Sequence, residues 1–113
     1  MGIVSYEGIG EVVITVMLAE DMKMGQVVRM VENQWAGPCT DGDEFCGVIV
    51  SMRDFHSGVQ VKGFVPVKFT GEMKLGWVSL VGNGYGGVRQ GDGGVKCLVT
   101  HVDAESEIAM ICL

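Results

Sequence analysis

The sequence predicts a small all-β domain, a barrel or sandwich of two duplicated halves with little or no helix. Three observations lead to this fold class. The 113 residues include 18 glycines and two prolines between short apolar runs, which is typical of many tight turns. Apolar and polar residues alternate with a period of two, as in a sheet with one buried face. A motif that begins at Met22 also returns at Met73, 51 residues later.

Strands are expected between turn signals rich in glycine, asparagine and aspartate. The stretch from Val59 to Phe69 alternates most clearly, and Pro66 on its polar face indicates an edge position or a bulge. The first expected strand is apolar on both faces, which predicts cover on both sides or a neighbouring subunit on one. Residues 19–24 are compatible with a turn of helix. The expected strands are 11–18, 26–31, 45–52, 59–69, 77–81, 95–102 and 108–113.

An internal repeat organises the chain. Met22-Lys23-Met24-Gly25-Gln26-Val27 matches Met73-Lys74-Leu75-Gly76-Trp77-Val78, and Asn33-Gln34-Trp35-Ala36-Gly37 matches Asn83-Gly84-Tyr85-Gly86-Gly87 after a slip of one residue. Each copy reads as a turn that ends in glycine, a strand, and an Asn-x-aromatic-x-Gly hairpin. We therefore expect an N-terminal arm at 1–10 and a single β-barrel domain at 11–113, with pseudo-repeats at about 20–70 and 71–113.

The charge balance argues against two classes of partner. The net charge is −6, and the eight Lys and Arg residues are scattered, so no nucleic-acid partner is expected. The same acidity disfavours an anionic membrane surface. The first ten residues lack the pattern of a secretory signal, and the apolar run 12–19 is too short to span a bilayer. We expect a soluble protein made in a cytosol, with no membrane partner.

The sequence offers no catalytic residues, no metal site and no cofactor site that we can argue for. The four cysteines form no C-x-x-C pair, and a Cys39–Cys46 disulfide would require an oxidising compartment. His56 and His101 have no carboxylate or cysteine at a spacing that suggests a catalytic dyad. The acidic run 41–44 lacks the ligand spacing of a calcium loop, and the glycine-rich run 82–87 precedes no helix that would receive a phosphate. We expect that the chain is not an enzyme.

Two aromatic residues and the overall hydrophobicity point to binding. Trp35 and Tyr85 occupy equivalent places in the two repeats, where an aromatic side chain caps a hairpin or, alternatively, stacks on a sugar or peptide. The mean hydropathy is +0.34, and eight methionines are many for this length. These features favour an oligomer or an obligate partner surface.

The run Thr40-Asp41-Gly42-Asp43-Glu44-Phe45-Cys46-Gly47-Val48-Ile49-Val50, followed by the strand 59–69, carries a family resemblance. It resembles the small head-decoration (capsid cement) proteins of tailed bacteriophages, and the plan is similar to that of the lambda head decoration protein. The shared plan is a short N-terminal arm, a strand, a polar segment and an alternating strand. Gly76-Trp77-Val78-Ser79-Leu80 and the C-terminal apolar strand fit it too, so the resemblance covers about two-thirds of the chain. The duplication and the short arm depart from the lambda protein.

The resemblance implies a structural virion protein, made in the host bacterial cytoplasm, that binds the outer capsid surface and stabilises the assembled capsid. It implies a homotrimer that clamps neighbouring copies of the major capsid protein. The arm would then make the contact through Ile3, Val4, Tyr6 and Ile9, because such a segment can order as an added strand. The alternative is a small β-barrel that binds a carbohydrate or a peptide through Trp35 and Tyr85.

Overall fold

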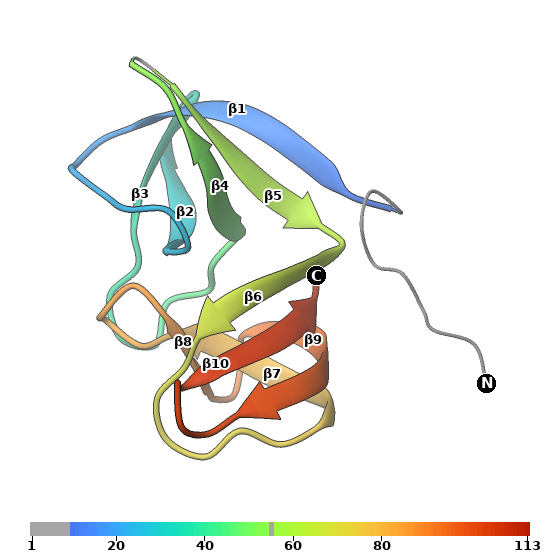
Figure 1. Cartoon of the computed structure of the whole chain (residues 1–113). Helices are drawn as coiled ribbons and strands as arrows, with labels where there is room; N and C mark the ends of the chain where they lie inside the picture. The colour runs from blue at the N-terminus through green and yellow to red at the C-terminus, as the bar shows by residue number, and fades with distance from the viewer. Residues whose placement is uncertain (1–9, 55) are drawn as a thin grey trace.

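The computed structural model describes residues 10–54 and 56–113, and within them the fold is all-β without helix, as predicted. Five strands form a closed barrel, and five more form a second sheet beneath it (Figure 1). None of the described residues belongs to a helix that could cross a membrane. The strands are β1 (Val12–Leu18), β2 (Val27–Glu32), β3 (Trp35–Pro38), β4 (Gly47–Met52), β5 (Ser57–Lys62), β6 (Phe64–Lys68), β7 (Gly76–Gly82), β8 (Val88–Gln90), β9 (Val95–Asp103) and β10 (Ile108–Cys112).

The two sheets share one connectivity, as a duplication predicts. The barrel has the order β1-β3-β2-β4-β5, and β5 pairs with β1 to complete the circuit. Adding five to each strand number of the barrel gives the circuit β6-β8-β7-β9-β10. The second sheet, β6-β10-β9-β7-β8, contains every neighbouring pair of this circuit except β6 with β8, so it is the same circuit opened between those two strands. Where β1 and β3 pair in parallel through Leu18 and Ala36, the second sheet has a parallel bridge between Phe69 and Val88. Both closing hairpins, β4–β5 and β9–β10, also contain a bulge.

The division between the halves lies at Gly63, whereas the sequence placed it near residue 70. The stretch 59–69, expected as one strand, is two strands that belong to different sheets. Gly63 has a φ of 99°, a conformation that glycine adopts without the Cβ clash of other residues, and the chain changes direction there. The N–H of Leu113 donates to the Gly63 carbonyl at 2.9 Å, which fixes the chain end beside this corner.

Several other expectations can be compared with the strands. Pro66 lies on β6, an edge strand, which confirms the interpretation of that proline. The short strands β3 and β8 were missed, and the expected strand 45–52 begins only at Gly47. Residues 19–24 form bends and a turn, and no helix. Gly25 and Gly76, which end the matching turns, have φ values of 89° and 96°, so the repeated glycines have the same backbone role.

The barrel and the second sheet share hydrophobic core. Four buried residues that come before Gly63 in the chain pack into the core of the second sheet: Val27, Cys39, Phe45 and Val48. A smaller cluster, which includes Val28, Ile49 and Val59, fills the barrel itself. The β3–β4 loop and the end of β7 are also bonded, because the Gly82 N–H donates to the Asp43 carbonyl at 2.8 Å. The two halves therefore form one packed unit.

Candidate functional site

Within the part of the chain that the structure describes, strand β1 is paired along one edge and open along most of the other. On one side it pairs with β5 from Val12 to Val16, whereas β3 meets it only at Met17 and Leu18. The Met17 N–H donates toward β3, to the Gln34 carbonyl at 2.8 Å. Because successive amides of a strand point to opposite edges, the amides of Val13 and Thr15 point to the same side as that of Met17. Apart from β5 along the opposite edge, no described strand pairs with β1 at Val13 or Thr15.

The side chains of the same segment are exposed. Val12, Val13 and Ile14 have exposed fractions of 46%, 50% and 37%. The sequence predicted that this doubly apolar strand is covered on both faces or by a neighbour, and the described residues do not supply that cover. An exposed, apolar strand edge is a template on which another chain can add a strand. We call residues 12–15 the β1 edge.

The second sheet contains a natural control for the β1 edge. The parallel bridges of the two sheets place Leu18 and Phe69 at equivalent positions. Thr15 lies three residues before Leu18, and Pro66 lies three residues before Phe69, so Pro66 is the counterpart of Thr15. The Phe69 N–H donates toward β10, to the Glu107 carbonyl at 2.9 Å, so position 66 faces the other, open edge of β6. Proline has no N–H to offer there and opposes strand addition. The fold thus blocks this edge in one half and leaves it available in the other.

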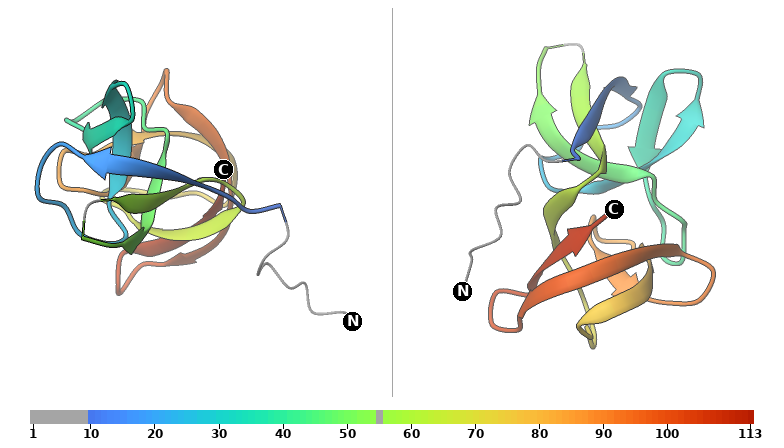
Figure 2. Two further views of the ribbon diagram at one scale, coloured as in Figure 1. Left: turned by 90° about the horizontal axis from the view of Figure 1, so that it is seen from above. Right: turned by 90° about the vertical axis from the view of Figure 1, so that its right-hand side faces the viewer.

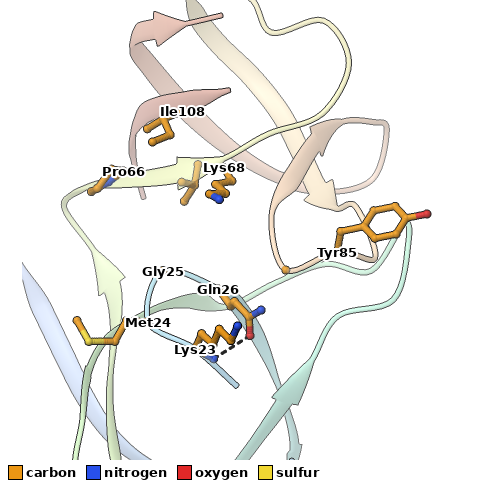
Figure 3. A pocket seen from close by; sticks show the side chains of 10 residues that line it. Lys23, Met24, Gly25, Gln26, Pro66, Lys68, Tyr85 and Ile108 are labelled. Atoms are coloured by element: carbon orange, nitrogen blue, oxygen red, sulfur yellow. Dashed lines mark hydrogen bonds between the residues drawn. The ribbon is translucent and has the colours of Figure 1, made fainter. Parts of the chain in front are cut away.

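A groove of about 450 Å³ lies between the barrel and the second sheet. Figure 3 shows residues 23–26, which connect β1 to β2, on one side and β6 with Ile108 on the other. The Val27 N–H donates to the Gly86 carbonyl at 2.9 Å and joins the two halves beside the groove. Gly86 has a φ of 88°, a conformation that glycine adopts without the Cβ clash of other residues. The lining residues include Lys23 and Lys68 but no Asp or Glu.

The loop between β7 and β8 is organised by a buried amide. Asn83 Oδ1 accepts hydrogen bonds from the N–H groups of Tyr85 (2.8 Å) and Gly87 (3.1 Å), and its Nδ2 donates to Thr70 Oγ1 at 3.2 Å. The loop holds Tyr85 at the end of the groove with its ring turned outward, 87% exposed (Figure 3). The sequence had assigned this segment to a hairpin loop without anion chemistry.

The structure places the predicted binding residues in different surroundings. Trp35 begins β3 at the β2–β3 turn, which lies at the end of the barrel away from the second sheet (Figure 2). Trp35 is not among the residues that line the groove beside Tyr85, so the two aromatics do not share that groove. Stacking of either on a ligand stays a prediction. The arm residues Ile3, Val4, Tyr6 and Ile9 lie outside the described residues.

The acidic run 41–44 has a structural role. Asp41 Oδ1 lies 2.7 Å from Arg89 Nε, an ion pair between the two halves, and Asp43 pairs with Arg29 at 3.4 Å. Hydrogen bonds from the N–H and hydroxyl of Thr40 lower the pKa of the Asp43 carboxyl. Among the residues that the structure describes, no three His, Cys, Asp or Glu side chains are grouped to hold a metal ion.

The cysteines are free thiols, including Cys39 and Cys46, for which the sequence left a disulfide open. Burial raises the pKa of Cys97 to about 11, and burial together with the nearby Asp43 raises that of Cys39 to about 11. Both thiols therefore stay protonated at neutral pH, where a thiol is a poor nucleophile.

Comparison with models of known protein families and with curated protein sequences finds no match. The β1 edge and the groove are thus defined by geometry alone. Sequence reasoning missed both for identifiable reasons. The sequence repeat begins at Met22, after β1, so it does not relate β1 to β6. It therefore does not show that Pro66 is the counterpart of Thr15. The groove depends on how the two sheets pack, which no local pattern of residues encodes.

Proposed function

We propose that this chain is a structural virion protein that binds the outside of an assembled phage capsid and stabilises it. The observation that carries the proposal is the β1 edge, which offers exposed apolar side chains and outward-facing backbone groups directly after the predicted arm. A strand from the partner would pair with the amides of Val13 and Thr15, while its side chains cover Val12 and Ile14. The partner in this proposal is the major capsid protein.

Stabilisation follows from mass action. A protein that binds only the assembled capsid lowers the free energy of that state and leaves the free capsid protein unaffected. Nothing in this mechanism requires a catalytic group, so it is compatible with buried, protonated thiols and with an acidic run occupied by ion pairs. The resemblance to decoration proteins supports a homotrimer, in which three copies engage neighbouring capsid subunits together.

The test uses undecorated capsids assembled from the major capsid protein of the same genome. Added protein should co-sediment with the capsids and raise their disruption temperature, measured by light scattering. Sedimentation equilibrium of the free protein should give three times the 12.1 kDa chain mass. Deleting residues 1–10 should leave the circular dichroism of the β-fold intact and reduce capsid occupancy. A monomer that neither co-sediments nor shifts the disruption temperature would refute the proposal.

A further inference from the structure

We infer that the groove between the two sheets binds an extended, acidic peptide segment of a partner protein. The inference rests on the proposed function only for the partner's identity, which would be the major capsid protein. None of the described residues that line the groove belongs to the β1 edge, so the groove is a second contact. Its ligand class follows from two features: its charge and its apolar walls.

The charge of the groove is opposite to that of the molecule. The chain has 14 acidic and eight basic residues, yet the groove lining contains two lysines and no carboxylate. Figure 3 shows Lys23 and Lys68 on opposite sides of the groove. The ion pairs among the described residues use Arg29 and Arg89 instead, so both lysines remain available to a ligand. Two ammonium groups across a groove suit a ligand that carries more than one carboxylate.

Apolar side chains also line both sides of the groove. Met24, 61% exposed, lies on the barrel side, and Pro66 and Ile108 lie on the other. A polypeptide with alternating acidic and apolar side chains can place carboxylates on the lysines and apolar groups on these walls. Because Pro66 removes a donor from the β6 edge, recognition here would come from side chains, unlike the backbone pairing proposed for β1.

The repeat supplies matched controls for two of the contacts, Lys23 and Met24. Lys74 is the counterpart of Lys23, and Leu75 is the counterpart of Met24 with a similar exposed fraction of 66%. Neither residue lines the groove. Substitutions at the two members of a pair change the same chemistry in the same local context, and only one member contacts the proposed ligand.

The experiment is a titration of the ¹⁵N-labelled full chain with a short capped peptide that alternates glutamate and valine. A peptide with glutamine in place of glutamate is the comparison. The glutamate peptide should shift the amide resonances of residues 23–26, Lys68 and Ile108, and the glutamine peptide should bind at least about tenfold more weakly. The K23Q/K68Q variant should lose about tenfold in affinity, and M24S severalfold, whereas K74Q and L75S should bind like the wild type.

The outcomes separate this inference from the proposed function. Equal shifts with both peptides, shifts away from the groove, or no shifts at millimolar peptide would overturn the inference, even if the protein binds capsids. Equal losses in the single variants K23Q and K74Q would also overturn it. Groove binding by a protein that does not bind capsids would leave the inference standing and remove the proposed function.

Discussion

Asn83 is the residue whose hydrogen bonds shape the β7–β8 loop. Its side chain is buried and bonds two backbone N–H groups and the Thr70 hydroxyl. Asn33, its counterpart in the sequence repeat, is exposed at the β2–β3 turn. The two asparagines therefore contribute differently to the stability of the fold, because only Asn83 is buried.

Asn83→Ala should lower the free energy of unfolding by about 2–3 kcal/mol, because it leaves the N–H of buried Gly87 without its acceptor. Asn33→Ala should change it by less than about 0.5 kcal/mol, as is usual for an exposed position. Urea denaturation followed by circular dichroism measures both. Similar losses for the two variants would contradict the role that we assign to Asn83.

At the scale of elements, the sequence predicted most strands because alternation and glycine turns are local signals. It could not divide residues 59–69, because the alternation continues through Gly63 while the chain passes from one sheet to the other. It also missed β3 and β8, which are only four and three residues long. Strands this short are identified by the strands with which they pair, because they contain too few residues to show an alternating pattern of their own.

The candidate site was less predictable than the fold, also at this scale. The apolar character of both faces of β1 is visible in the sequence, and a covering partner for it stays a prediction. Which edge is open depends on the register, since β3 pairs with β1 only at its end. Thr15 has a backbone N–H at the open edge, whereas Pro66 has none at the equivalent position. This difference depends on the strand pairing of the two sheets, which the sequence does not show.

At the scale of the whole molecule, the shared core predicts one cooperative unit. Phe45 precedes the first strand of the β4–β5 hairpin but is buried in the cluster that fills the second sheet. The ion pair of Asp41 with Arg89 and the backbone bonds of Gly82 add further links between the halves. The second sheet therefore loses part of its core if the barrel unfolds.

The chain has one tryptophan in each half, Trp35 in β3 and Trp77 in β7, and these can report the two unfolding transitions separately. Fluorescence of the W35F and W77F variants in urea should show the same transition as circular dichroism of each variant. Phe45→Ala should shift both transitions together, with a loss of about 3–5 kcal/mol. Transitions that separate, with the second sheet unfolding alone in F45A, would show that the halves are independent.

We expect substitutions at the β1 edge to have little effect on the rest of the fold, because its side chains are exposed. Thr15→Pro gives β1 the residue that β6 has at the equivalent position, and it removes an N–H that points away from β5. Thr15→Val removes the hydroxyl and keeps the N–H. Val13→Lys keeps the backbone intact and places a charge on the exposed edge, as natural edge strands do against strand addition.

The most direct measurement of the central claim is the affinity of these variants for undecorated capsids, with the native fold checked by circular dichroism. We expect Thr15→Pro and Val13→Lys to bind at least about tenfold more weakly than the wild type, which corresponds to about 1.4 kcal/mol. Thr15→Val should bind like the wild type. Wild-type affinity in folded Thr15→Pro and Val13→Lys would contradict the claim that the open edge of β1 is the capsid-binding surface.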